Sequence, residues 1–478
     1  MLFNSAEFLV FFAVVASGYF ALPHRARWLW LLAASYFFYG SWRVEYLGLI
    51  LISTAVDYGV GLGLHRTQGT GARRSLLVLS LVVNLGLLFT FKYFNFFVSS
   101  IESVVASAGM DYLIPHLTLL LPVGISFYTF QTLSYTLDLY RGEIPAERHA
   151  GRFALFVAFF PQLVAGPIER ARRLLPQLAE KHDFEYARVR SGLILMLSGL
   201  FKKMVIADRL GVVVDFVYGS PERCPGPLLA LGTVFFAFQI YCDFSGYTDI
   251  ARGCARVLGI ELMKNFNRPY VARSISDFWR RWHLSLTTWF RDYVYVPLGG
   301  NRSGRRRWVL NVAAVFLLSG LWHGANWTFV IWGAIHATFY FVERLWQKTR
   351  EFSIAIEGFR LAATFFLVCI AWVFFRAESI SDAWYIVLSM TEGWLQSASY
   401  SEIASLLPAM DISAPAFCVS GALILFLVGV ETYQGERDIE DVIAARPQWL
   451  RWSIYIALVM AIWNLGITHE TPFVYFQF

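Results

Sequence analysis

A histidine between two apolar runs gives the strongest chemical signal in the sequence. His323 lies in the segment GLWHGAN, where small residues surround it and Asn326 is a hydrogen-bonding neighbour. The apolar runs 308–322 and 327–343 flank this turn. Ionisable residues inside a membrane are costly and usually line a site or a pathway. Imidazole readily accepts and returns a proton near neutral pH, so the pattern predicts acid–base chemistry at His323.

A second polar group lies upstream, in the stretch between Gln239 and Arg307 that is rich in Arg, Asp, Trp and Tyr. Its charged and titratable residues fall within two helical turns: Asp277, Arg280, Arg281 and His283. Two tryptophans between them supply apolar bulk, which predicts one amphipathic helix at or in the cytoplasmic interface. As an alternative to a site, Arg280 and Arg281 would bind anionic lipid headgroups.

The elements that hold these residues are predicted to be membrane helices. Hydrophobic residues make up 57% of the 478 residues and charged residues only 15%, whereas soluble domains have about 25% charged residues. The 17 tryptophans, 23 tyrosines and 43 phenylalanines suit two interfacial belts. We therefore expect an all-α, polytopic membrane protein with about 11–13 transmembrane or re-entrant helices around a central tunnel, in one domain spanning 1–478.

The apolar runs place the expected spans, each about 20 residues long at 1.5 Å per residue. They are 5–22, 28–42, 45–64, 75–99, 113–138, 151–168, 190–218, 227–247, 308–322, 327–343, 358–375, 414–431 and 452–468. The first has no basic residue before it, as expected for a retained span rather than a cleaved signal peptide. The run 308–322 would give about 22 Å of helix, short of the roughly 30 Å hydrocarbon core. We therefore expect His323 to turn inside the membrane.

Charge in the loops predicts the orientation. Basic residues follow the first, third and fifth spans and the run 327–343, whereas acidic residues follow the fourth: Arg25, Arg27, Arg66, Arg73, Arg74, Arg141, Arg148, Arg152, Arg344, Lys348 and Arg350, against Glu102 and Asp111. The positive-inside rule then places the N-terminus outside the cytoplasm, so the net charge of +6 is mostly a topology signal and not a nucleic-acid footprint. Arg170, Arg172, Arg173, Lys202 and Lys203 break the alternation, which predicts re-entrant or in-plane pieces within 160–300.

Other chemistries lack their motifs. The five cysteines form no CxxC pair or metal-like spacing, so no disulfide framework or metal site is indicated. The sequence has no GxSxG, Walker, GxGxxG or HExxH motif. For His336, on the helix after His323, a structural role is the favoured interpretation. The site must then be built from His, Asn, Asp, Tyr and Arg.

Motifs along nearly the whole chain carry a family resemblance. They are LPVGISFYTFQTLSYTLDLYRG (121–142), LVAGPIER (163–170), QIYCDFSGYTDIARG (239–253), NFNRPY (265–270), SISDFWRRWHLSLTTWFRDYVYVPLGGNR (274–302), GLWHGANWTFVIWGAIHA (320–337), FRAES (375–379) and the closing FVYFQF. The chain resembles the membrane-bound O-acyltransferase (MBOAT) superfamily. Within it, the chain resembles the bacterial branch of alginate and peptidoglycan O-acetyltransferase membrane subunits and the D-alanyl-lipoteichoic acid transferase.

The resemblance implies roles for individual residues. His323 would be the essential catalytic histidine and His283 its partner in the same tunnel. A cytoplasmic acyl donor, by resemblance acetyl-CoA, would place its phosphates on Arg280, Arg281 and the 302–307 cluster, because arginine forks suit phosphates. Substrate would also contact Asn326, Trp322, Asp277 and Tyr128. No bound cofactor is expected, and an acyl-imidazole intermediate stays open.

The resemblance also implies an extracytoplasmic acceptor. The acetyl group would reach hydroxyls of a polysaccharide at the bacterial inner membrane, directly or through a periplasmic O-acetyltransferase partner. Alginate, cellulose, peptidoglycan and other exopolysaccharides remain open as acceptors. Two alternatives are a transporter or channel for acyl groups or a glycan, with the histidines in a proton relay, and a non-catalytic scaffold for polysaccharide export. Gly- and Pro-interrupted runs such as 121–126 and 161–167 suit the transporter alternative.

Overall fold

Helices make up every regular element in the part of the chain that the computed structural model describes, residues 1–110, 114–302, 304–346, 354–467 and 471–474. A chain in lipid must satisfy its backbone hydrogen bonds internally, and a helix does so within one segment. Five helices are long and apolar enough to cross a membrane: Val44–Arg66, Thr70–Ser107, Gly226–Val257, Glu357–Arg376 and Ala414–Gln434. The all-α, polytopic membrane fold expected from the sequence is therefore confirmed. Asp111, Lys348, Arg350 and residues 475–478 of the closing motif lie outside the described residues.

Outward-facing apolar side chains mark the lipid-facing surfaces of several helices. Val82 is 64% exposed, Leu425 75% and Trp463 81%. Many further large apolar side chains are exposed on the described helices, and extended apolar surface is rare on soluble monomers. They agree with a multi-pass membrane protein.

The described chain divides into two compact units. Unit 1 comprises Met1–Gly192 and Ala251–Met263, and unit 2 comprises Leu193–Ile250 and Lys264–Phe478. Helices α10 (Tyr186–Leu200) and α12 (Gly226–Val257) each contribute residues to both units. The expectation of one domain over 1–478 stays a prediction.

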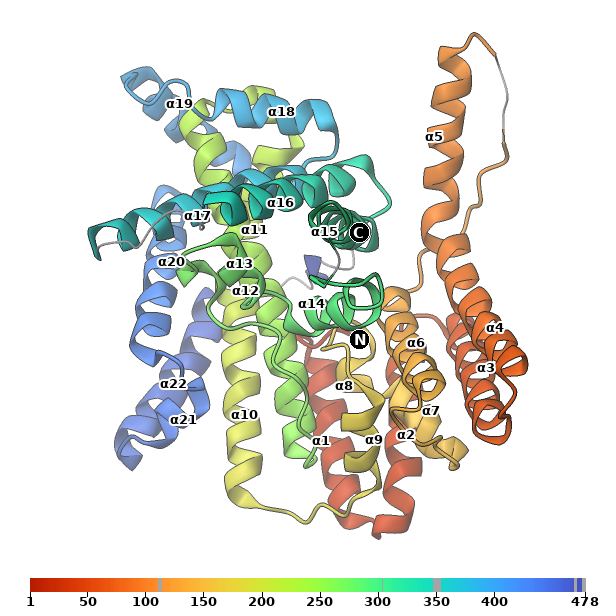
Figure 1. Ribbon diagram of the computed structural model, residues 1–478. Coiled ribbons are helices and arrows are strands. Elements are labelled where there is room, and N and C mark those ends of the chain that lie inside the picture. Colours follow the sequence, from red (N-terminus) through yellow and green to blue (C-terminus); the bar gives the residue numbers. More distant parts are fainter. Residues whose placement is uncertain (111–113, 303, 347–353, 468–470, 475–478) are drawn as a thin grey trace. The chain divides into compact units, whose positions relative to one another are not determined.

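Unit 1 is built from nine further helices within its described residues. They are α1 (Ala6–Ala21), α2 (His24–Gly40), α3 (Leu47–Arg66), α4 (Thr70–Leu88), α5 (Phe94–Ser107), α6 (Ile125–Arg141), α7 (Ala150–Ala158), α8 (Phe160–Leu163) and α9 (Ala171–Ala179). A π-helical turn, Phe89–Tyr93, joins α4 to α5 in one continuous helix, and Figure 1 shows α3 and α4 side by side.

A buried carboxylate joins three helices of unit 1. Asp57 of α3 accepts hydrogen bonds from Asn84 Nδ2 of α4 at 2.8 Å, from Thr136 Oγ1 of α6 at 3.0 Å and from the Ser80 hydroxyl. Ser53 Oγ donates to Asn84 Oδ1 at 2.6 Å. Polar side chains of this kind hold membrane helices together, because apolar packing alone gains little against lipid.

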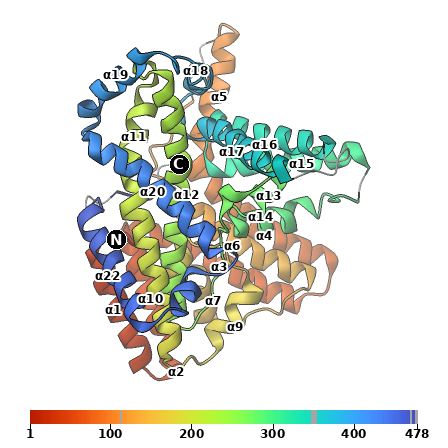
Figure 2. The same cartoon turned by 90° about the vertical axis from the view of Figure 1, so that its left-hand side faces the viewer.

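Unit 2 holds the remaining helices. They are α11 (Asp208–Gly219), α13 (Ile275–Trp279), α14 (Leu284–Phe290), α15 (Arg305–His323), α16 (Trp327–Trp346), α17 (Ile354–Arg376), α18 (Ile380–Ser389), α19 (Ser397–Leu406), α20 (Ala414–Gln434), α21 (Ile439–Ala444) and α22 (Gln448–Leu465). The apolar run 190–218 becomes α10, a π-helical turn at Phe201–Ala207, and α11. Helices α16 and α17 lie across the direction of α11 and α12 (Figures 1 and 2). Trp282, Trp332 and Trp372 are fully buried in this unit.

Candidate functional site

Two glycines bring the backbones of α15 and α16 into contact. A Cβ atom on Gly320 would lie 2.2 Å from the carbonyl oxygen of Phe329, and one on Gly333 would lie 2.3 Å from that of Phe316. Only glycine allows so close an approach. The hairpin therefore holds its turn, with His323 as the last residue of α15, in a fixed place.

The length of α15 differs from the expectation. The helix has 19 residues because it begins at Arg305 rather than Trp308 and ends at His323 rather than Trp322, which gives about 28 Å of rise instead of 22 Å. Both lengths are below the roughly 30 Å of the hydrocarbon core, so the expectation that His323 turns inside the membrane stays a prediction. The structure does show that His323 is buried within the protein, since the residue is only 4% exposed.

Aromatic rings surround the imidazole of His323. The ring centroids of Trp322, Trp332 and Phe375 lie 5.0, 5.1 and 5.3 Å from its own, with interplanar angles of 81°, 84° and 71°. These are edge-to-face contacts, which aromatic pairs favour. Helices α15, α16 and α17 each supply one of the three rings, so the imidazole is held by the packing of three helices.

His283 lies beside His323. Its backbone is left-handed, with φ 44° and ψ 55°, and its side chain is fully buried. The imidazole contacts Phe244 of α12 at 4.7 Å and Trp322 at 5.9 Å between centroids, and the two imidazole centroids are 6.3 Å apart. The structure thus brings the two predicted histidines together.

The helix predicted around His283 is interrupted by the left-handed backbone of that residue. The expected single amphipathic helix over Asp277–His283 is wrong, because α13 ends at Trp279 and α14 begins at Leu284. Trp282, between them, is fully buried among aromatic rings rather than placed at an interface. The chain breaks there because a left-handed residue cannot continue a right-handed helix.

Asn326 has a local structural task. Its Oδ1 accepts a hydrogen bond from the backbone N–H of Thr328 at 3.1 Å, and its Nδ2 donates to the carbonyl oxygen of Glu378 at 3.3 Å. The side chain therefore stabilises the start of α16 and ties the turn to the residues after α17. Its role in substrate binding stays a prediction.

The predicted phosphate-binding arginines differ in their surroundings. Arg281 Nε donates to Asp277 Oδ1 at 2.9 Å, and its guanidinium lies 3.9 Å from Glu436 Oε1. Arg280 is exposed and makes no side-chain hydrogen bond or ion pair with any described residue. Of the two, Arg280 is therefore the one that can receive an anion without breaking an existing pair.

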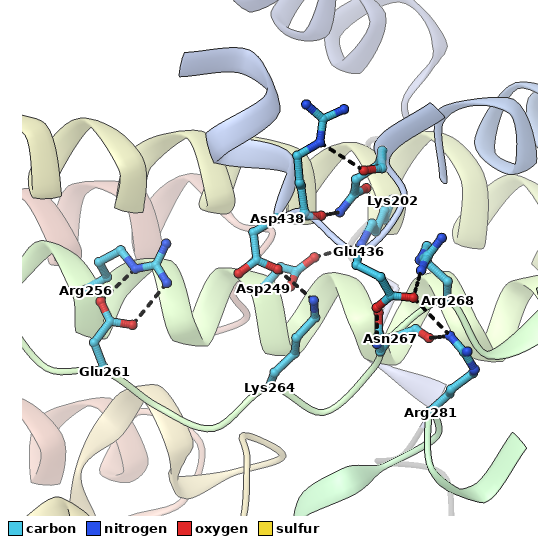
Figure 3. Close-up of polar contacts among 12 residues, drawn as sticks. Lys202, Asp249, Arg256, Glu261, Lys264, Asn267, Arg268, Arg281, Glu436 and Asp438 are labelled. Carbon is cyan, nitrogen blue, oxygen red and sulfur yellow. Dashed lines mark hydrogen bonds and ion pairs between the residues drawn. The ribbon is translucent and has the colours of Figure 1, made fainter. Parts of the chain in front are cut away.

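Figure 3 shows how the loop after α20 is bound to the segment 264–281. Lys264 Nζ lies 2.6 Å from Asp438 Oδ1, and Asn267 Nδ2 donates to Glu436 Oε2 at 3.2 Å. Arg268 also pairs with Glu436. The hydrogen bond from Asn267, followed by the positive charges of Arg268 and Arg281, lowers the pKa of the Glu436 carboxyl. These contacts hold the loop against the stretch that carries Arg281.

A buried ion cluster was missed in the sequence. Lys203 Nζ lies 2.7 Å from Asp243 Oδ1 and 2.8 Å from Asp208 Oδ1, and all three side chains are almost fully buried. Asp243 Oδ2 accepts the backbone N–H of Val474 at 2.9 Å, and the ammonium lies 4.5 Å from the ring of Phe473. The cluster thus holds Phe473 and Val474 in the interior of unit 2. The available signal was the pair of lysines in an apolar run together with the aspartates of DFSGYTD.

The second lysine of that pair is also engaged within unit 2. Lys202 Nζ donates to Asp249 Oδ2 at 2.8 Å (Figure 3). On the same helix as Asp249, Tyr241 donates a hydrogen bond to the buried carboxylate of Glu431. Both lysines that broke the expected span pattern are therefore neutralised by aspartates on α12 or α11.

Two further residues named in the sequence analysis are also buried. Tyr128 belongs to α6 of unit 1, is 1% exposed, and its hydroxyl has no hydrogen-bond partner among the described residues. His336 is fully buried between Phe278, Trp279, Phe316 and Trp332, and neither ring nitrogen bonds to a described residue. The site roles of all the named residues stay predictions. Within the described ranges, no three His, Cys, Asp or Glu side chains gather as a metal site would require.

Comparison with known proteins gives a consistent result. A family model described as the membrane-bound O-acyltransferase family matches residues 149–380. A protein of Azotobacter vinelandii named probable alginate O-acetylase is 42% identical over 395 residues, which cover 82% of this chain and 78% of that protein. A protein of the same name from Pseudomonas putida is 37% identical over 504 residues, which cover both chains fully. The peptidoglycan O-acetyltransferase of Helicobacter pylori is 37% identical over 424 residues, covering 82% of this chain and 80% of that protein.

Proposed function

Because this chain belongs to the membrane-bound O-acyltransferase family and is an O-acyltransferase, we propose that it moves an acetyl group toward hydroxyls of an extracytoplasmic polysaccharide. The proposed donor is cytoplasmic acetyl-CoA, and the proposed acceptor is alginate or a related cell-envelope glycan. The names of the relatives support this acceptor class. The observation that carries the proposal is the pair of buried imidazoles, His283 and His323, 6.3 Å apart.

The chemistry is an acyl transfer from sulfur to oxygen. The acceptor hydroxyl attacks the thioester carbonyl carbon, the new C–O bond forms, and the C–S bond breaks. His323 takes the hydroxyl proton and returns it to the departing thiolate, so coenzyme A leaves as the thiol. Such general acid–base catalysis typically contributes about 100- to 10,000-fold. A covalent acyl-imidazole on His323 would divide the same transfer into two steps.

His283 suits the task of polarising the thioester carbonyl oxygen. A donor placed at that oxygen stabilises the negative charge that develops during attack. The ring of His283 lies next to that of His323, whereas the amide of Asn326 is used in the turn that starts α16. We therefore assign the polarising role to His283 in this proposal.

The donor's phosphates would meet an exposed basic surface. Arg280 is free of described partners, and Arg302, Arg305, Arg306 and Arg307 are exposed as well. The basic loops support a cytoplasmic position for this surface, with the N-terminus in the periplasm of an inner-membrane protein. A periplasmic O-acetyltransferase that receives the acetyl group is the proposed partner.

Acetyl content of the cell's glycans tests the proposal. Strains carrying His323→Ala or His283→Ala should lose acetylation by about 100-fold or more, at protein levels equal to wild type. His65→Ala is the matched control, because that histidine is exposed. Purified wild-type protein should also release coenzyme A thiol from labelled acetyl-CoA, and the His323→Ala protein should not. Full acetylation by a normally assembled His323→Ala protein would contradict the proposal and favour transport.

A further inference from the structure

Unit 1 contains a cavity lined by basic side chains. The cavity has a volume of about 310 Å³ and lies among the end of α1, the start of α2, the start of α7 and the end of α9. Arg25, Arg27 and Arg152 line it together with His24 and His149. Glu180, which is exposed, is the one acidic residue in the lining. The volume falls at the lower end of the range for small-molecule sites.

The three arginines have different roles in the wall. Arg27 is fixed, because its Nε donates to the carbonyl oxygen of Leu22 at 3.0 Å and its guanidinium stacks on the Tyr19 ring at 4.8 Å. Arg25 is exposed and its side chain pairs with no described residue. Arg152 Nη2 lies 3.2 Å from Glu147 Oε1, but its Nε is buried without an acceptor among the described residues. The cavity thus presents a free cation and an unsatisfied buried donor.

The backbone at the cavity also favours an anion. Helix α2 begins at His24, its first turn contains no acidic residue, and no side chain caps it. The first N–H groups of a helix lack internal partners and carry a partial positive charge, so helix N-termini attract anions. Trp28 of the next turn lines the cavity and contacts the ring of His149 at 4.8 Å. The lining therefore combines arginine guanidinium groups, the N–H groups at the start of α2 and the aromatic ring of Trp28.

We propose that this cavity binds a phosphate-bearing anion. Arginine forks and helix N-termini match the geometry and charge of a phosphate group. The basic start of α2 would lie on the cytoplasmic side, where two sources offer that group: an anionic phospholipid headgroup and the phosphates of a coenzyme. The cavity shares no lining residue with the arginines assigned above to the acetyl donor, so the proposal stands whether or not the proposed acetyl transfer is correct.

Calorimetric titration of the purified, delipidated full chain tests the site. Coenzyme A and dioctanoyl phosphatidylglycerol are titrated separately, with dioctanoyl phosphatidylcholine as the lipid of no net charge. At least one of the two anions should bind saturably, and Arg25→Gln/Arg152→Gln should weaken that binding by about 10-fold or more. Whichever anion shows this loss identifies the source.

Matched variants keep the result interpretable. Arg66→Gln/Arg74→Gln removes the same charge from exposed positions outside the cavity and should change the affinity by less than about twofold. Arg25→Glu alone alters an exposed, unpaired side chain, so it should weaken binding without affecting folding. The proposal is overturned if neither anion binds the wild type, or if every anion that binds the wild type binds both Arg25 variants equally.

Discussion

The ammonium of Lys203 lies 2.7 Å from Asp243 Oδ1, and the residue that follows Asp243 on α12 is Phe244, whose ring contacts His283. On α12, the aspartate of the buried ion cluster is thus next to the aromatic residue that contacts His283. Asp243 also accepts the backbone N–H of Val474. Asp243 therefore binds the backbone of Val474 and also directly precedes the aromatic residue that contacts His283.

Lys203→Met should be strongly destabilising. The change leaves the carboxylates of Asp208 and Asp243 buried without their cation, and breaking a buried pair in this way costs about 3–5 kcal/mol. Unfolding of the purified protein by denaturant would measure the loss. Lys264→Met is the control, since that lysine and Asp438 are each one-third exposed and such a pair contributes about 0–1 kcal/mol. Equal stability of the two variants would argue against the buried cluster.

Trp332→Phe should impair turnover by altering the placement of His323. The indole meets the imidazole edge to face at 5.1 Å and is fully buried. A smaller ring leaves space into which the imidazole can tilt, and a misplacement of about 1 Å can cost up to about 100-fold in rate. The kcat for acetyl transfer should fall by about 10- to 100-fold while KM for the donor changes little. A rise in KM with unchanged kcat would assign Trp332 to donor binding instead.

Gly320→Ala should separate α15 from α16. The added methyl group would lie 2.2 Å from the carbonyl oxygen of Phe329, and backbone cannot yield cheaply. Destabilisation of about 1–3 kcal/mol is expected, together with loss of acetylation. Gly429→Ala in α20 is the matched control, because nothing lies within 4 Å of its added Cβ. That variant should be neutral or slightly more stable, since alanine favours helix, and similar losses in both variants would contradict the close contact.

Glu436→Gln should have a small effect that depends on pH. The hydrogen bond from Asn267 lowers the pKa of Glu436 below its ordinary value of 4.5 in the folded protein. The ionised carboxylate therefore stabilises the fold above pH 4.5, and this contribution is lost as pH falls through the lowered pKa. Near pH 7 the variant should melt about 1–2 °C below wild type. Thermal melts at several pH values should show the difference vanish under acid conditions, and a difference that grows toward acid would have the wrong sign.

Local sequence patterns predicted the α15–α16 hairpin well. The apolar runs on either side of GLWHGAN form two packed helices, and His323 lies at the turn between them. This prediction succeeded because a helix and the turn that follows it depend mainly on residues that are neighbours in the sequence. The start of α15 was placed three residues late, since Arg305, Arg306 and Arg307 were assigned to a loop. Charged residues can extend a membrane helix when their side chains are exposed, as these are.

Contacts between distant residues were not predictable in the same way. His283 has a left-handed backbone, and its ring contacts Phe244, which is distant in the sequence. The helical spacing of Asp277 and His283 instead pointed to an unbroken helix. Asp243 and Val474 are 231 positions apart, so their hydrogen bond appears in no local pattern. The two lysines in an apolar run indicated that partners must exist, but not which residues they were.

Backbone contact at Gly320 and Gly333 restricts how a reactant can reach the buried imidazole. Helices α15 and α16 touch through their main chains, so sliding one helix along the other would make carbonyl oxygens clash with Cα atoms. The two helices must therefore move together as one rigid body. The rings of Phe375 and Phe244 belong to other helices and are not held by that contact. Entry and exit of reactants should therefore be gated by rotation of those two rings or by displacement of α17, while His323 stays still.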